Sequence, residues 1–114
     1  MLRYRINPGE LRHKISIQQY SKLTNDYGEV EINNDGIWTE VMTIKAGIYP
    51  ISGREFFAAE TVNSEITHKV KIRYTEGLKS NMRIVFNNRI FSIESIINFK
   101  ELNIELQLLC KELV

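Results

Sequence analysis

Ser64-Glu-Ile-Thr-His-Lys-Val-Lys-Ile-Arg-Tyr74 decides the fold class, because apolar and polar residues alternate here more regularly than anywhere else in the chain. Successive side chains of a β-strand point to opposite faces. One parity is expected to face the core, and the other forms a polar outer face with a basic stripe. The inner residues are Ile66, His68, Val70, Ile72 and Tyr74, and the outer ones are Thr67, Lys69, Lys71 and Arg73.

Strand patterns recur along most of the chain. They cover residues 11–20, 37–50, 82–86, 89–97 and 102–110. Phe91, Ile93 and Ile97 share one parity, as do the residues of the last stretch, Leu102, Ile104, Leu106, Leu108 and Cys110. Asn87-Asn88 favours a two-residue hairpin turn, since asparagine tolerates positive φ. These patterns predict a mainly β fold: one domain over residues 1–114, built as a small antiparallel β-barrel or sandwich of about six strands.

The stretch 37–50 has apolar residues of both parities. Trp38, Glu40 and Met42 belong to one set, with Ile44, Ala46 and Ile48, whereas Val41 and Tyr49 belong to the other. Both faces are therefore expected to contact apolar groups over part of the length, as in a strand that curls around a barrel or also faces another subunit. Gly47 is expected to mark a bulge or bend, and Pro50 to end the strand.

Two segments interrupt the strand pattern. Ser52-Gly-Arg-Glu55 has the spacing of a capping box and predicts one short α-helix near residues 53–62. Residues 21–36 are polar and contain two turn signals, Asn25-Asp-Tyr-Gly28 and Asn33-Asn-Asp-Gly36. They predict a long surface loop or a flexible hairpin.

Composition argues against several classes of protein. Fifteen basic and fourteen acidic residues leave a net charge of +1, so the broad basic field of a tight nucleic-acid binder is missing. A single cysteine cannot form an internal disulfide, which fits synthesis in a reducing cytoplasm. No apolar run approaches the length of about 18 residues that a membrane span needs.

Catalysis and metal binding have little support. His13 and His68 lie at core parity, without a second histidine or a cysteine at metal-ligand spacing, and Cys110 also has core parity. The acidic residues of the 21–36 loop do not match a calcium-binding loop. No catalytic residue, metal ligand or cofactor site is therefore predicted, and the chain is not expected to be an enzyme.

Two surfaces are candidates for contacts with other molecules. Lys69, Lys71 and Arg73 form either a solvated strand face or a weak contact to DNA or a protein partner. The amino-terminal arm before Asn7 either covers the barrel or grips a neighbour. A small barrel that binds single-stranded nucleic acid is the alternative function from another class. It requires exposed aromatic residues beside the basic stripe, and Tyr74 and Phe91 lie at core parity instead.

Short motifs in a fixed order resemble those of the head-tail joining proteins (head completion, stopper or adaptor proteins) of tailed bacteriophages and prophages. They span nearly the whole chain: Asn7-Pro-Gly-Glu-Leu-Arg-His-Lys-Ile-Ser-Ile-Gln18, Trp38, Ala46-Gly-Ile48, Ser52-Gly-Arg-Glu55, Met82-Arg-Ile84, Phe91-Ser-Ile93 and Leu106-Gln-Leu-Leu-Cys-Lys-Glu112.

The resemblance implies a structural connector that forms a homo-oligomeric ring, commonly a dodecamer, in the virion neck at the portal vertex. It would be made in the cytoplasm of the bacterial host. Its partners would be the portal or adaptor protein, the tail-completion protein and, transiently, the packaged DNA, with no membrane contact. Another phage neck or tail-completion protein of similar fold is the nearer alternative.

Candidate site residues follow from the resemblance by position. Within the 21–36 loop, the channel or gating residues would be Asn25, Asp26, Tyr27, Gly28 and Glu29. Subunit contacts would come from Arg3 and Tyr4 of the arm and from Arg54. The capping box leaves Arg54 without a role, and an arginine in the first turn gains nothing from the helix dipole.

Overall fold

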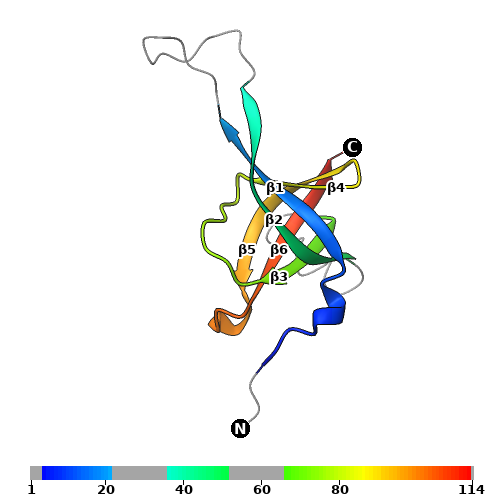
Figure 1. The fold of residues 1–114 in the computed structure, drawn as a ribbon, viewed down its shortest axis with the longest axis vertical. Helices are drawn as coiled ribbons and strands as arrows, with labels where there is room; N and C mark the ends of the chain where they lie inside the picture. The colour runs from blue at the N-terminus through cyan, green and yellow to red at the C-terminus, as the bar shows by residue number, and fades with distance from the viewer. Residues whose placement is uncertain (1–3, 22–35, 52–65, 114) are drawn as a thin grey trace.

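The described part of the chain forms a closed antiparallel β-barrel (Figure 1). This computed structural model describes residues 4–21, 36–51 and 66–113. The strands are β1 (His13–Ser21), β2 (Ile37–Pro50), β3 (His68–Arg73), β4 (Arg83–Phe86), β5 (Arg89–Asn98) and β6 (Glu105–Leu113). Their order around the barrel is β1-β2-β3-β6-β5-β4, and β4 pairs with β1 to close it. The predicted small β-barrel is confirmed, whereas the extent of one domain over 1–114 stays a prediction.

Helical structure among the described residues consists of two short 3-10 helices, η1 (Pro8–Glu10) and η2 (Phe99–Glu101). The side chain of Asn7 caps η1 by accepting a hydrogen bond from the amide of Gly9 at 3.0 Å. The α-helix predicted near 53–62, with its capping box, falls within residues 52–65 and lies outside the described residues. Residues 22–35 of the predicted loop do so as well.

The barrel interior is filled by the inward-facing residues of all six strands. Its fully buried members include Ile15, Ile17, Val70, Ile72, Ile84, Phe91, Ile93, Leu108 and Cys110. Apart from Ile84, for whose strand no inner face was predicted, alternation predicted these positions correctly, because a closed barrel hides one parity of every strand. Burial of the Cys110 thiol, in addition, raises its pKa to about 12, so this cysteine is an unreactive part of the core.

The Asn87-Asn88 turn between β4 and β5 is confirmed. Both asparagines have positive φ, 47° and 65°, as a two-residue primed turn requires. The turn matches the twist of the two strands and fixes their register, in which Phe86 pairs with Arg89.

A β-bulge at Val41 explains the mixed parity of 37–50. Ile17 pairs with Met42 and Gln18 pairs with Glu40, so Val41 is an extra residue in β2. Beyond the bulge the inward parity is inverted, which puts Trp38 and Glu40 on the outer face although they share parity with Met42. Of the bulge or bend expected at Gly47, the bulge is wrong, since Gly47 pairs regularly with Lys71. A side chain at Gly47 would instead meet the carbonyl oxygen of Glu10 at 2.7 Å.

A second bulge at Glu94 overturns one predicted core residue. Ile93 pairs with Cys110 and Ser95 pairs with Leu109, so Glu94 is the extra residue. The parity change turns Ile97 outward, where it is 41% exposed. Ile96 packs against the core in its place.

Two further predicted core residues are exposed because they lie beyond the ends of their strands. Tyr74 follows β3 and is 36% exposed, and Leu102 precedes β6 and is 46% exposed. The Tyr74 amide still donates a hydrogen bond to the Ile104 carbonyl at 2.9 Å, so Tyr74 is exposed at the very end of the β3–β6 pairing. The inner face therefore ends sooner than the sequence pattern indicates.

The ends of β1 and β2 continue past the barrel as a two-stranded ribbon. β1 pairs with β4 only at Ser16–Gln18, and β2 pairs with β3 only from Ala46 onward. Gln19–Ser21 and Ile37–Thr39 therefore pair only with each other among the described residues. Figure 1 shows this ribbon extending away from the other strands.

Candidate interaction site at the amino-terminal arm

The amino-terminal arm, residues 4–10, covers part of the outer face of the barrel. Ile6 is 4% exposed, although it precedes the first strand. The ring of Tyr4 packs against Phe99 with centroids 4.9 Å apart. The Glu10 carboxylate accepts a hydrogen bond from Lys71 Nζ at 3.3 Å. Of the arm before Asn7, the described residues Tyr4 and Ile6 thus contact the barrel. The other alternative left open by the sequence, contact with a neighbouring subunit, stays a prediction.

Glu105 is the buried acid beneath this arm. It pairs with Arg73 across β3 and β6, on the outer face, yet its side chain is fully buried. Its two carboxylate oxygens accept hydrogen bonds from the Tyr4 hydroxyl and from Gln107 Nε2, the second at 2.6 Å. A buried carboxylate without such donors would be costly. The Tyr4 hydroxyl of the arm and the Gln107 amide therefore replace water as hydrogen-bond donors to the Glu105 carboxylate.

The Tyr4 hydroxyl is tightly held as a donor. Its hydrogen bond to Glu105, with burial and the negative charges of Glu105 and Glu10, raises the pKa of Tyr4 to about 12. The Tyr4 phenol therefore keeps its proton at physiological pH. This contact joins the first described residue of the arm to the start of the last strand.

The basic stripe lies on the outer face of β3, but its three members differ in exposure. The side chain of Lys71 is 17% exposed, because it pairs with Glu10 and lies 5.7 Å from the centre of the Tyr49 ring. Lys69 is half-buried, whereas Arg73 is exposed. The arm therefore interrupts the stripe and leaves Arg73 as the member best placed for an outside contact.

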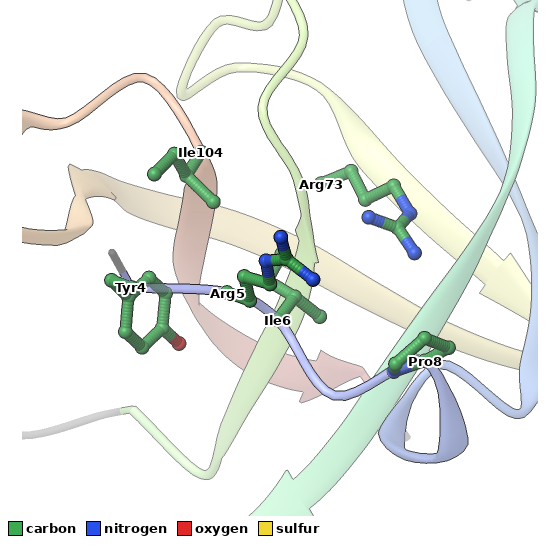
Figure 2. A pocket seen from close by; sticks show the side chains of 6 residues that line it. All are labelled: Tyr4, Arg5, Ile6, Pro8, Arg73 and Ile104. Atoms are coloured by element: carbon green, nitrogen blue, oxygen red, sulfur yellow. The ribbon is translucent and has the colours of Figure 1, made fainter. Parts of the chain in front are cut away.

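Arg73 borders a cleft between the arm and the barrel, with a volume of about 470 Å³. The described residues that line it are Tyr4, Arg5, Ile6, Pro8, Arg73 and Ile104. Figure 2 shows the side chains of Arg5 and Arg73 on the same side of the arm. The cleft thus combines two guanidinium groups with apolar walls.

Other predicted site residues lie outside the described residues. They are Arg3 of the arm, Arg54 of the predicted helix, and the predicted channel residues Asn25, Asp26, Tyr27, Gly28 and Glu29. Their roles stay predictions. Tyr4, in contrast, contacts its own barrel in this structure of a single chain.

An exposed aromatic cluster on the ribbon was missed by sequence reasoning. Tyr20 and Trp38 pair across β1 and β2, with ring centroids 5.2 Å apart. The Arg83 guanidinium lies 4.2 Å from the centre of the Trp38 ring, and its Nε donates to Gln18 at 2.7 Å. Burial lowers the pKa of Arg83, and a guanidinium keeps its charge in proteins. The missing signal was the Val41 bulge, which turns Trp38 outward.

The two histidines are the first residues of their strands, His13 of β1 and His68 of β3, and both are half-buried. His13 packs on Phe86 and His68 packs on Phe91, with centroid distances of 4.8 and 5.1 Å. Burial chiefly lowers the pKa of His68, which favours its neutral form. Within residues 4–21, 36–51 and 66–113, no group of three histidine, cysteine or acidic side chains is arranged to hold a metal ion. None of the helices in these ranges has the length and apolar character to cross a membrane.

Comparison with solved structures places the barrel in a known fold class. The chain is similar to the solution structure of protein SF1141 from Shigella flexneri 2a, with a TM-score of 0.70 and 22% sequence identity. The match covers 94% of this chain and 96% of the other. A comparison with curated protein sequences gave no match.

The family follows from the sequence profile. The profile of the phage head completion proteins matches residues 6–113, so the chain belongs to this family. The resemblance inferred from the ordered motifs is thereby confirmed. Membership defines a structural role at the phage head-tail junction, as a virion component that contacts other virion proteins.

Proposed function

We propose that the chain is a head-closure connector without enzymatic activity. It assembles as a ring, with a dodecamer as the expected size, below the portal and its adaptor protein. The ring helps to retain packaged DNA and presents the docking surface for the tail-completion protein. The protein is made in the cytoplasm of the bacterial host and acts in the virion neck at the portal vertex.

One observation carries this proposal: exposed apolar residues lie at two separate places on the barrel. The ribbon and the adjoining bulge expose Tyr20, Ile37, Trp38 and Val41, and the region around η2 exposes Ile97 and Leu102. Figure 1 shows the ribbon and η2 at opposite ends of the barrel. A ring requires a heterologous interface, in which one patch meets a different patch of the next subunit.

The charge of the molecule is consistent with a DNA conduit. A net charge of +1, with Lys71 already paired to Glu10, leaves each subunit little excess positive charge to place on DNA. Many tight phosphate contacts, multiplied around a ring, would hold DNA too strongly for release. The contact of Lys69, Lys71 and Arg73 with packaged DNA is accordingly proposed to be weak and transient.

The gating role of Asn25–Glu29 stays a prediction. Its support is the position of the loop's two ends, Ser21 and Ile37, which pair at the end of the ribbon farthest from the barrel core. Loop ends held in this way would let a loop reach a neighbour or a channel without unfolding the barrel.

One observation supports the alternative function, the binding of single-stranded nucleic acid. Tyr20, Trp38 and Arg83 combine exposed aromatic rings with a cation, the pairing that stacks bases in other barrels. Titration with a labelled oligonucleotide at two salt concentrations separates this alternative from the connector. Tight binding by the monomer that weakens steeply with salt would favour it.

Ring assembly on DNA-filled heads that lack this protein tests the proposal. Purified protein added to such heads should appear by electron microscopy as a ring at the portal vertex. Ile37→Asp and Leu102→Asp, each placing a charge in one apolar patch, should prevent the ring while the monomer stays folded. Tyr74→Asp is the matched control on an exposed aromatic outside both patches. Binding without a ring, or no effect of either patch variant, would contradict the proposal.

A further inference from the structure

We propose that the cleft between the arm and the barrel binds a carboxylate-bearing, partly apolar extended segment of another virion protein, with Arg5 and Arg73 as its anchors. The identity of that partner depends on the proposed connector role, whereas the chemistry of the cleft does not. Nothing in the ring proposal assigns a function to this cleft, which differs from both exposed apolar patches.

The first support is an arginine deprived of its natural partner. Arg73 and Glu105 are directly opposite on β3 and β6, the register in which an acid and a base form a cross-strand pair. The Glu105 carboxylate instead accepts hydrogen bonds from Tyr4 and Gln107. Among the described residues, Arg73 has no ion pair or hydrogen bond for its side chain. Because Glu105 is hydrogen-bonded to Tyr4 of the arm, the Arg73 guanidinium remains available for an anion from outside.

The second support is the composition of the cleft. Arg5 is exposed and, like Arg73, has no side-chain partner among the described residues. No acidic residue is among the six described residues that line the cleft. Figure 2 shows both guanidinium groups on the side of the arm that faces away from Tyr4's ring. Two unpaired guanidinium groups at one cleft attract an anion, and their planar forks match a carboxylate in a bidentate manner.

The walls distinguish a peptide from a bare anion. Ile6, Pro8 and Ile104 supply apolar surface beside the two arginines. A phosphate chain would gain nothing from this surface, whereas a segment that alternates acidic and aliphatic side chains would bury its aliphatic ones there. The low net charge of +1 also disfavours a general anion surface.

A titration with synthetic peptides, followed by the backbone amide resonances of the whole chain, tests the binding chemistry. The probe is an acetylated and amidated Val-Glu-Val-Glu peptide, compared with Val-Gln-Val-Gln, inorganic phosphate and a thymidine oligonucleotide. We expect the glutamate peptide to shift amides of Arg5, Ile6, Arg73 and Ile104, with saturation below about 10 mM. The glutamine peptide should bind at least about tenfold more weakly, because charge-assisted hydrogen bonds are lost.

Variants locate the site. Arg5→Ala and Arg73→Ala should each lower the affinity for the glutamate peptide about tenfold. Arg73→Lys keeps the charge but loses the planar guanidinium, so it should give an intermediate loss of affinity. Arg12→Ala removes an exposed arginine outside the cleft and should change nothing. Both arginines are exposed, so the spectra of the variants should show a folded barrel.

The following results would overturn the inference: no shifts at the cleft, equal affinity for both peptides, tighter binding of phosphate or oligonucleotide at the cleft, or variants without effect. Self-association that depends on Arg5 and Arg73 would also overturn it, because the cleft would then bind a second copy of this chain instead of another virion protein. Assembly of rings on heads is measured separately. Ring formation with a cleft that binds no peptide would contradict only this inference, and peptide binding without rings would contradict only the connector.

Discussion

The hydroxyl of Tyr4 donates a hydrogen bond to Oε1 of Glu105, across 101 positions of sequence. This contact attaches the amino-terminal arm to the first residue of β6. It buries a carboxylate on the outer face of a strand, where water would otherwise solvate it. The same contact leaves Arg73 without its cross-strand acid, so it connects the stability of the arm to the chemistry of the cleft.

Tyr4→Phe should destabilise the chain by about 1–3 kcal/mol, because it leaves a buried carboxylate oxygen without its donor. The free energy of unfolding in urea measures the effect. Tyr74→Phe is the matched control, since it removes a hydroxyl from a tyrosine that is 36% exposed. An equal, small effect of the two substitutions would show that the Tyr4 hydroxyl does not support Glu105.

The raised pKa of Tyr4 predicts a loss of stability in alkali. In the unfolded chain Tyr4 loses its proton near pH 10, whereas in the folded chain its pKa is about 12. Its contribution is complete below pH 10 and is lost as the pH rises from 10 towards 12. The stability difference between the wild type and Tyr4→Phe should therefore be constant below pH 10 and shrink above it. A difference that stays constant through this range would contradict the assignment.

Phe91→Ala should cost about 3–5 kcal/mol, since the ring is fully buried at the centre of the barrel. Ile97→Ala, at the same parity in sequence, should change stability by only about 0.5 kcal/mol because the Glu94 bulge turns it outward. Urea unfolding of both variants measures this contrast. A large loss of stability from Ile97→Ala in the isolated chain would show that Ile97 lies in the core and would contradict the bulge at Glu94.

Arg83→Ala should shift the tryptophan fluorescence of the chain to longer wavelength. Trp38 is its single tryptophan, and the Arg83 guanidinium covers its ring at 4.2 Å. Loss of that cover exposes the indole to water and removes a cation–π contact worth about 0.5–1 kcal/mol. Arg12→Ala is the control and should leave the emission unchanged. An unchanged emission in Arg83→Ala would mean that the two side chains do not stack in solution.

Local patterns in the sequence were sufficient to predict the barrel. Sequence patterns identified each of the strands found in the described residues, and the limits of 37–50 match β2. Asn87-Asn88 predicted its turn because the tolerance of asparagine for positive φ depends on the residue type alone. The family emerged from short motifs whose order, rather than any one of them, is characteristic.

The two bulges could not be located from the sequence. Val41 stands out in 37–50 as an apolar residue of the opposite parity, but the same mixed parity is expected of a regular strand with apolar contacts on both faces. Only the register with the partner strand shows that Val41 and Glu94 are extra residues. The prediction for Ile97 was wrong for this reason, and Trp38 was grouped with Met42 although the bulge puts the two residues on opposite faces. The exposed aromatic pair of Tyr20 and Trp38 was therefore missed.

The arm site was also beyond the reach of alternation. Glu105 has the parity of a solvent-facing residue and does lie on the outer face. Its burial comes from a segment about a hundred positions away, and contacts of that separation leave no local pattern. The only available signal was the pair of apolar residues in the arm, Tyr4 and Ile6, beside two arginines.

Retention of packaged DNA tests the central claim, that this chain closes the head, most directly. Particles assembled without the protein are purified, treated with nuclease and assayed for protected genome-length DNA. Head closure predicts heads that fill, then lose DNA and carry no tails, with protection and tail attachment restored by added wild-type protein. Full, stable and tailed particles in its absence would contradict the account.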